Sequence, residues 1–258
     1  MTSRRDAMLK EMGLTPVWRL RVPAGHAAPA APEPASTARA EPAPSPVESF
    51  HSVTPVLEDD RRAAIMRMDW PALKEAVAKC CDCPLHAKRN KTVFGVGDEN
   101  ADWMFIGEGP GADEDALGDP FVGQAGRLLD NMLAAIELKR GQNVYIANVV
   151  KCRPPGNRNP EPAEALSCEP FLQRQIALIK PRLIVALGRV AAVNLLARDA
   201  SVASMRSRVL DYNGTPLIVT YHPAYLLRSL TEKAKAWEDL CFAVKTMKEL
   251  QAAIAAPT

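Results

Sequence analysis

The chain has 258 residues, of which 47% are hydrophobic and 24% charged, a composition typical of a globular protein. A formal net charge of +2 neither demonstrates nor excludes a nucleic-acid partner, so any basic surface must be local. No run of about 18 uncharged apolar residues is present, and no apolar segment follows Arg4 and Arg5. We therefore expect a soluble, cytoplasmic protein with neither a transmembrane helix nor a secretory signal.

Residues 1–58 are expected to lie outside the folded domain. Residues 1–23 carry apolar side chains among basic ones, which predicts a short docking peptide; a dispensable extension is the alternative. Residues 24–58 are rich in Ala and Pro and hold almost no large apolar side chain. Such a segment cannot bury enough surface to offset the entropy lost on ordering. It predicts a disordered linker that tethers the peptide to the domain.

Residues 59–253 are predicted to form the folded domain, in which strands and helices alternate. The domain begins with a helical segment over 60–80, broken near Pro71, and ends with a helix over Glu232–Ala253. The four apolar runs with β character are Trp103–Ile106, Val144–Val149, Leu183–Leu187 and Leu217–Tyr221. The helix-patterned segments between them are Ala125–Ile136, Pro162–Ile179 and Val190–Ala197. This alternation predicts a parallel sheet covered by helices on both faces.

A glycine-rich turn follows the first apolar run. Its sequence, Gly107-Glu108-Gly109-Pro110-Gly111, predicts a strand that ends in a tight turn, where backbone N–H groups can approach a ligand. Asp113, Glu114 and Asp115 come next, and Phe121 follows them, so general-base and stacking groups lie at the same edge. The carboxyl ends of parallel strands are where open α/β sheets place their sites. An ordinary surface turn with solvated acids is the alternative.

The cysteines predict a metal site rather than disulfides, because a cytoplasmic protein keeps its thiols reduced. The six are Cys80, Cys81, Cys83, Cys152, Cys168 and Cys241. Cys80 and Cys83 have the spacing of a chelating pair, and Cys152 and Cys168 can supply two further ligands. Four thiolates suit either tetrahedral zinc or an iron–sulfur cluster, and the spacing alone does not choose between them. Cys81 competes with Cys80 as a ligand, and Cys241 is expected to be buried in the last helix.

Asn148 stands near the end of the second apolar run. Its amide can donate and accept at once, which suits the edge of a nucleobase; a strand-end Asn that caps a turn is the alternative. The following loop carries Arg153 and Arg158, which are candidates for DNA phosphate contacts.

His222 ends the fourth apolar run, directly before a proline. It is well placed to form a hydrogen bond to a ligand, although an isolated His is more often structural. The neighbouring Tyr225, Leu226 and Leu227 stand beside Arg228. This mixture suits an apolar wedge that enters a duplex while the Arg binds phosphate. A hydrophobic turn that closes the core is the alternative.

Together these motifs resemble the family 4 uracil-DNA glycosylases, the iron–sulfur branch of that superfamily. The resemblance spans about Cys80 to Leu250. The motifs that carry it are Gly107–Gly111, Pro120–Gly123, Asn148–Pro155 and His222–Arg228. It implies a three-layer α/β/α sandwich with a four-stranded parallel sheet. Its [4Fe–4S] ligands carry over to Cys80, Cys83, Cys152 and Cys168. Its uracil pocket carries over to Gly107, Glu108 and Gly109, with Phe121 stacking, Asn148 on the base edge and His222 near the uracil oxygen.

The resemblance further implies a monofunctional enzyme that flips uracil out of DNA, hydrolyses its N-glycosidic bond and starts base-excision repair. His222 would stabilise the departing uracil anion. Glu108 is the first candidate for activating water, with Glu114 and Asp115 as alternatives, because other branches carry an Asp at the position of Gly109. A related branch that traps uracil covalently has a His-containing insertion after the Asn motif. Residues 154–162 hold no His, so we expect turnover.

Two rival functions use the same residues differently. A non-catalytic iron–sulfur module that recognises damaged DNA would share the cysteines and the basic loops. It would not need Phe121, Asn148 and His222 together. A zinc-dependent hydrolase would use the same cysteines for a different metal.

Residues 1 to about 20 also resemble the amino-terminal peptide of the psi subunit of the bacterial replicative clamp loader, which docks on the clamp-loader collar. This resemblance implies that Met1–Val22 binds the clamp loader. The protein is otherwise expected to be a monomer that acts on uracil-containing DNA in the bacterial nucleoid, without a membrane partner.

Overall fold

The structure, a computed structural model, describes residues 55–255. The expected docking peptide over 1–23 and almost all of the expected linker over 24–58 lie outside this range. Within it, no helix has the length and apolar character needed to cross a membrane.

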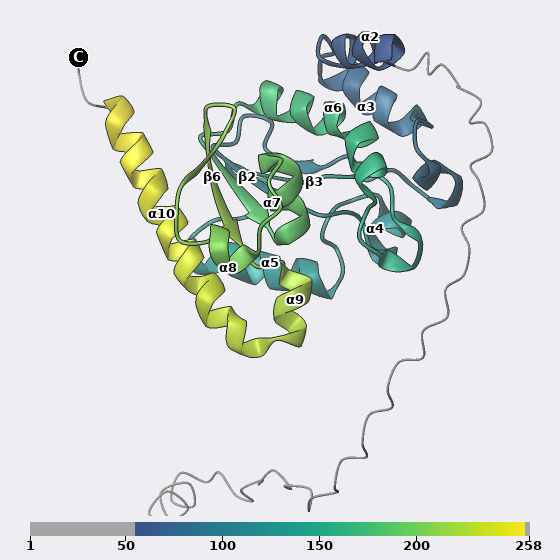
Figure 1. Ribbon diagram of the computed structural model, residues 1–258. Helices are drawn as coiled ribbons and strands as arrows, with labels where there is room; N and C mark the ends of the chain where they lie inside the picture. The colour runs from purple at the N-terminus through teal and green to yellow at the C-terminus, as the bar shows by residue number, and fades with distance from the viewer. Residues whose placement is uncertain (1–54, 256–258) are drawn as a thin grey trace, which may run out of the picture. The chain divides into compact units, whose positions relative to one another are not determined.

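Helices and strands alternate along the described chain (Figure 1). The helices before the sheet are α2 (Pro55–Ile65), α3 (Trp70–Lys79) and the 3-10 turn η1 (Pro84–Lys88). The strands are β1 (Val96–Gly97), β2 (Trp103–Gly107), β3 (Val144–Asn148), β4 (Leu183–Leu187), β5 (Leu210–Tyr212) and β6 (Thr215–Thr220). The helices among and after them are α4 (Ala112–Leu117), α5 (Gln124–Ala135), η2 (Pro155–Asn157), α6 (Pro162–Ile179), α7 (Arg189–Leu196), α8 (Val202–Met205), α9 (Pro223–Arg228), η3 (Leu230–Glu232) and α10 (Lys233–Ala255).

The sheet has six strands in the order β1-β3-β2-β4-β6-β5. Its four central strands are parallel, as expected, and correspond to the four apolar runs. The two additional strands are antiparallel edges, of two residues in β1 and three in β5. They escape prediction because a strand of two or three residues is too short to show an alternating pattern.

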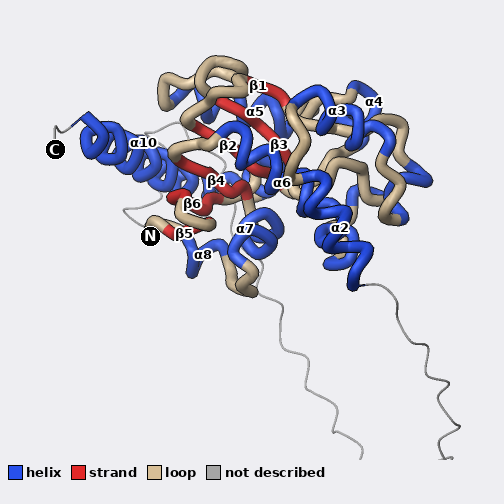
Figure 2. The backbone as a smooth tube through the Cα atoms, turned by 90° about the horizontal axis from the view of Figure 1, so that it is seen from above, coloured by secondary structure: helices blue, strands red, loops and turns tan. Residues whose placement is uncertain are grey.

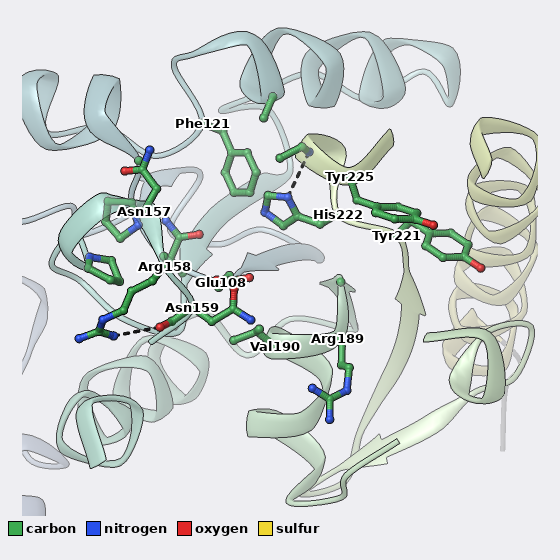
Figure 3. A pocket seen from close by; sticks show the side chains of 18 of the residues that line it. Glu108, Phe121, Asn157, Arg158, Asn159, Arg189, Val190, Tyr221, His222 and Tyr225 are labelled. Carbon is green, nitrogen blue, oxygen red and sulfur yellow. Dashed lines mark hydrogen bonds between the residues drawn. The ribbon is translucent and has the colours of Figure 1, made fainter. Parts of the chain in front are cut away.

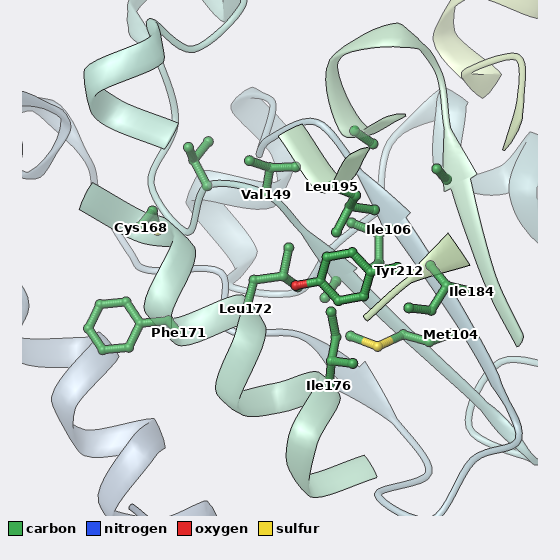
Figure 4. Close-up of a cluster of buried hydrophobic side chains, with 14 of the residues drawn as sticks. Met104, Ile106, Val149, Cys168, Phe171, Leu172, Ile176, Ile184, Leu195 and Tyr212 are labelled. Atoms are coloured by element: carbon green, nitrogen blue, oxygen red, sulfur yellow. The ribbon is translucent and has the colours of Figure 1, made fainter. Parts of the chain in front are cut away.

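Each face of the sheet is covered by its own layer of helices, which confirms the three-layer sandwich (Figure 2). Alternate residues of a central strand point to opposite faces, as the pleat requires. In β2, Trp103 and Phe105 pack against α5 and α10, whereas Met104 and Ile106 pack against α3, α6 and α7. Figure 4 shows the cluster that contains Met104 and Ile106, in which α6 lies over the sheet.

From Trp103 onward the expected boundaries of the long elements agree with the structure to within two residues, whereas the first helix begins at Pro55, five residues earlier than expected. The helical segment over 60–80 is two helices, because Asp69 caps a new helix whose first turn contains Pro71. Helix α4, directly after the glycine-rich turn, was not expected. Cys241 is exposed on α10, so the expectation that it is buried is wrong.

The chain leaves the sheet in opposite directions after β2 and β4. After β2 it continues to α5 on one face, and after β4 it continues to α7 on the other. Adjacent parallel strands whose connections diverge leave a crevice at their carboxyl ends, where such sheets bind ligands. The glycine-rich turn and Gly188 lie at this crevice.

Candidate active site

The crevice holds a cavity of about 580 Å³ (Figure 3). Four segments that are far apart in the sequence meet in its wall: the glycine-rich turn, the segment around Phe121, the end of β3 and the start of α9. Phe121, Asn148 and His222 all line it, together with Glu108 and Gly109. The three side chains that the sequence predicts as one pocket therefore lie in one pocket.

Asn148 ends β3 and is only 2% exposed. Its Oδ1 is buried and accepts no hydrogen bond from any described residue. A buried polar atom without a hydrogen-bond partner is rare because it lowers the stability of the folded chain. Such an atom in a cavity therefore indicates a ligand-binding site. Gly107 lies opposite in the register of β2 and β3, and a Cβ there would come within 2.5 Å of Asn148 Oδ1. Glycine at 107 is therefore required for the amide to lie where it does.

Phe121 presents its ring to the same space. Its ring centroid lies 5.5 Å from that of His222, with the two planes tilted by 31°. A Cβ on Gly107 would come within 2.6 Å of Phe121 Cζ, so the missing side chain also makes room for the ring. Phe121 has a φ of 56°, a left-handed conformation that is rare for a bulky residue.

His222 is the N-cap of α9. Its Nδ1 accepts a hydrogen bond from the backbone N–H of Ala224 at 3.1 Å. The ring proton of the neutral form must then sit on Nε2, which can donate to a ligand. Burial, reinforced by the charge of Arg228, lowers the pKa of His222 to about 4. The imidazole is consequently neutral at physiological pH, and no described residue accepts from its N–H.

Of the three candidate carboxylates, Glu108 alone has unengaged oxygens in the cavity. It lines the cavity and forms no side-chain hydrogen bond or ion pair within residues 60–253, and burial raises its pKa. Glu114 accepts from the N–H groups of Gly111, Val122 and Gly123 at 2.9–3.1 Å. Asp115 is fully buried and accepts from the backbone and the side chain of Asn90. Both of these carboxylates hold loops in place.

One of the residues predicted to form an apolar wedge at α9 is buried. Leu226 is 1% exposed and packs with Met132 and Leu240 beneath α9, so it cannot enter DNA while α9 stays folded. Tyr225 and Leu227 are 39% and 41% exposed. Neighbouring residues of one helix turn point in different directions, which the sequence pattern of a six-residue helix does not resolve.

The two predicted phosphate-binding arginines differ in their engagement. Arg158 makes a bidentate pair with the buried carboxylate of Glu164, at 2.7 and 2.8 Å, and lines the cavity from there. Among the described residues, Arg153 donates from Nε alone, to Asn157 at 2.7 Å. Arg228 is exposed on α9. Arg153 and Arg228 are therefore the freer cations beside the cavity.

A second, much smaller cavity is lined by Cys80, Cys83, Cys152 and Cys168. The thiols come from the loop after α3, the loop after β3 and helix α6. Cys81 does not line it: this thiol is exposed and donates to the carbonyl of Lys79. Among the described residues, no three His, Cys, Asp or Glu side chains are arranged to hold a single metal ion.

Two of these sulfurs accept hydrogen bonds from the chain, whereas Cys80 Sγ donates one to Asp82 at 3.2 Å. Arg89 donates to Cys152 Sγ at 3.1 Å and to the carbonyl of Cys80 at 2.8 Å. The backbone N–H of Lys151 donates to Cys168 Sγ at 3.3 Å. Burial raises the pKa of Cys80 to about 11 and that of Cys168 to about 12. A donor set of this kind suits thiolates whose charge is shared with a bound metal centre.

Lys151 joins the two cavities. Its side chain is fully buried, and Nζ donates to the carbonyl of Asn148 at 2.9 Å and to Gln175 Oε1 at 2.6 Å. Sequence reasoning missed this lysine, since nothing in the pattern distinguishes a buried lysine from an exposed one. It also missed Gly188, although a glycine directly after an apolar run is the signal that marks Gly107. A Cβ on Gly188 would lie 2.8 Å from His222 Cβ.

Comparison with known proteins agrees with this geometry. Residues 94–241 match the family model of the uracil DNA glycosylase superfamily. The type-4 uracil-DNA glycosylase of Thermotoga maritima is 44% identical over 165 residues, which cover 63% of this chain and 85% of the relative. That of Pyrobaculum aerophilum is 41% identical over 182 residues, 67% of this chain and 92% of the relative. That of Archaeoglobus fulgidus is 44% identical over 159 residues, 58% and 79% of the two chains. With most of each relative's length matched, the chain belongs to the type-4 branch of the uracil-DNA glycosylase superfamily.

Proposed function

We propose that Phe121, Asn148 and His222 of this uracil-DNA glycosylase bind an extruded uracil, and that Glu108 activates the water that replaces it. The enzyme is a monofunctional hydrolase that flips uracil out of DNA and cleaves its N-glycosidic bond. The single observation that carries the assignment of residues is the buried, unpaired Oδ1 of Asn148 in the same cavity as the free donor of His222.

Recognition of uracil follows from the amide of Asn148. Uracil presents N3–H as a donor beside O4 as an acceptor, and a side-chain amide complements both. Cytosine presents an unprotonated N3 beside an amino group, which pairs less well in this fixed environment. A site that buries unpaired polar groups rejects the wrong base because the mismatch leaves those groups unsatisfied. Phe121 then stacks on the base and replaces part of the stacking lost on flipping.

Cleavage leaves a cationic sugar and a uracil anion. The Nε2–H of neutral His222 donates to the uracil oxygen on which negative charge develops, an interaction that is stronger in the transition state than in the ground state. Because burial lowers the pKa of His222 to about 4, the ring is already neutral at physiological pH, and its remaining N–H stabilises this anion by donating a hydrogen bond without transferring the proton. The base can therefore leave as an anion.

Glu108 is suited to the water because its oxygens are free and its surroundings are partly apolar. Its carboxylate accepts a proton from water while oxygen bonds to the sugar carbon. The products are free uracil and an abasic site.

The four cysteines that share the second cavity are proposed to hold a [4Fe–4S] cluster. Their chemistry fits: four thiols from three segments converge, with Arg89 donating to one sulfur and a backbone N–H to another. When bound, the cluster supplies a rigid cross-link between these segments, away from the uracil cavity. Purified protein should be brown, with broad absorbance near about 400 nm. Colourless protein that contains zinc would instead support the rival metal.

A strand-cleavage assay tests the proposed site. Oligonucleotides with U·G, U·A, single-stranded U and T·G are incubated with enzyme and treated with alkali, which breaks the strand at abasic sites. Asn148→Ala and His222→Ala should each slow excision by about 10²–10³-fold, as loss of a transition-state donor does. Asn194→Ala, an exposed amide on α7, is the control and should cut normally. Full activity of Asn148→Ala would overturn the proposed recognition.

Residues 1–22 are proposed to bind the replicative clamp loader. The support is the resemblance of this segment to the psi peptide together with its Ala- and Pro-rich connection to the domain. A peptide of Met1–Val22 should retain the clamp loader in a pull-down, and Trp18→Ala should weaken retention. No retention by the native peptide would exclude this partner.

A further inference from the structure

Phe121 holds a conformation that its own side chain disfavours. Its φ of 56° lies in the left-handed region, which costs free energy for a bulky residue and persists only where surrounding contacts impose it. The ring is nevertheless directed into the uracil cavity (Figure 3). The contacts that impose this conformation therefore help to determine where the ring lies.

The backbone around Phe121 is held from three sides. The guanidinium of Arg140 donates from Nη1 to the carbonyl of Pro120 at 2.8 Å and from Nη2 to that of Phe121 at 2.9 Å. Glu114 accepts from the two following N–H groups. Against α5, a Cβ on Gly126 would come within 1.8 Å of the Phe121 oxygen, so the segment lies directly on the helix.

Arg140 acts from outside the cavity. It lies in the turn between α5 and β3 and does not line the uracil site. Its Nε donates to Asp130 of α5 at 3.0 Å, so the guanidinium is anchored to the helix while its other two nitrogens hold the carbonyls. A planar fork of donors suits two adjacent carbonyl oxygens, and a lysine could not reproduce it.

We propose that Arg140 is a positioning residue for base stacking: by fixing two successive carbonyls, it holds Phe121 in the conformation that presents its ring to the flipped uracil. The proposal deepens the assigned site and rests on the proposed stacking role of Phe121. Without Arg140 the segment relaxes toward an ordinary backbone conformation, and the ring leaves the plane on which the base stacks.

A double-mutant cycle isolates this role. Arg140→Met, Phe121→Ala and the double variant are compared with the native enzyme in single-turnover excision and in base flipping. Flipping is followed by the fluorescence of 2-aminopurine beside a 2′-fluoro uracil nucleotide, which resists cleavage. Phe121→Ala should weaken flipping by about 5- to 100-fold, the range of base–aromatic stacking. Arg140→Met should cause a smaller loss, about three- to tenfold, and almost none in the Phe121→Ala background.

Three further variants define the controls. Arg140→Lys keeps the charge without the fork and should lose nearly as much as Arg140→Met. Arg182→Met removes a comparable surface arginine paired with Asp102, and should leave flipping unchanged. If Arg140→Met unfolds, Asp130→Asn weakens the same anchor more gently and replaces it in the cycle.

The outcomes separate this proposal from the proposed site. Loss of flipping in Arg140→Met that disappears in the Phe121→Ala background supports it. An equal loss in both backgrounds, or no loss, overturns it while the stacking role of Phe121 stands. If Phe121→Ala itself flips and excises uracil normally, both the stacking role and the positioning of Phe121 are overturned, whereas the roles of Asn148 and His222 are unaffected.

Discussion

Asn148 lines the uracil cavity and Cys152, four residues later, lines the cysteine cavity. The polar groups of the two cavities differ in whether they have hydrogen-bond partners. In the uracil cavity, Asn148 Oδ1 and the oxygens of Glu108 have no partner among the described residues. In the cysteine cavity, Arg89 and the backbone of Lys151 donate to the sulfurs. A buried polar group without a partner lowers the stability of the folded chain, but it is available to bind substrate. A buried polar group with a partner does not carry this cost. The difference supports the proposal that one cavity binds the substrate and the other stabilises the fold.

Lys151 lines the cysteine cavity and connects it to the uracil cavity. Its backbone N–H contacts Cys168 Sγ and its Nζ holds the carbonyl of Asn148. A second connection runs through Arg89 and Asn90 to Asp115 on α4, and from α4 through Glu114 to the Phe121 segment. Disorder among the cysteines should therefore reach the uracil cavity.

The largest effect is expected from Cys152→Ala. Loss of one ligand removes the proposed cluster and its cross-link, and the free energy of a structural metal site is largely free energy of folding. The melting temperature should fall by roughly 10 °C or more, together with excision and the absorbance near about 400 nm. Cys81→Ala is the matched control, since its exposed thiol does not line the cavity. If Cys81→Ala lost the absorbance instead, the ligand assignment would be wrong.

Glu108→Gln should affect chemistry alone. Removing the base should slow excision about 10²–10³-fold, while the melting temperature stays the same or rises because a buried charge is lost. Burial raises the pKa of Glu108, so native activity should increase with pH as this carboxyl ionises above its ordinary 4.5. The slow activity of the Gln variant should lack that rise. The same rise in the variant would assign the ionisation to another group.

The sequence predicts the sheet and the pocket because both follow from local patterns. Apolar runs mark the four parallel strands, and strand ends mark Gly107, Asn148 and His222. Parallel strands carry their carboxyl ends to one edge, so residues 74 positions apart in the sequence, such as Asn148 and His222, could be placed together. That these side chains together form a uracil pocket was implied by the family resemblance.

The remaining features depend on tertiary contacts that no local pattern carries. The choice between Leu226 and Leu227 depends on how α9 packs on α10, and the roles of Arg140 and Lys151 depend on carbonyls that fold against them. Cys80 and Cys81 are adjacent, so only the direction of each thiol distinguishes them. The preference for Glu108 over Glu114 likewise depends on which carboxylate the backbone engages.

His222 should make the free energy of unfolding depend on pH. Its pKa is about 4 in the folded chain against 6.5 ordinarily, mainly because burial disfavours the charged ring. Above pH 6.5 the ring is neutral in both the folded and the unfolded chain, so the free energy of unfolding does not depend on this group. Between pH 6.5 and 4 the unfolded chain binds a proton that the folded chain does not, so stability falls as pH falls, by up to about 3 kcal/mol.

The matched variant for this measurement is His222→Asn, because Asn is also a good N-cap for α9. Unfolding free energies of both proteins are measured from pH 7.5 to pH 4. The difference between them should change by about 3 kcal/mol in favour of the Asn variant toward pH 4. A difference that is independent of pH would mean that the ring is protonated as easily in the folded chain as in the unfolded one.

The smallest effect is expected from Leu227→Ala. Its side chain is exposed beside the cavity and carries little of the folding energy, so the melting temperature should not change. If it fills the space left by the flipped base, excision from U·A duplex should slow about three- to tenfold, and excision from single-stranded DNA should not, because no stack remains to be stabilised.

Leu226→Ala should instead lower the stability of the protein and affect both DNA substrates equally. Its side chain is buried against Met132 and Leu240, so truncation should cost about 2–5 kcal/mol of stability. Duplex and single-stranded substrates should then lose activity equally, since the damage is to the fold of α9. Suppose instead that Leu226→Ala loses excision activity on duplex DNA preferentially and Leu227→Ala does not. This result would mean that α9 rotates when it binds DNA and that the buried Leu226 is the wedge.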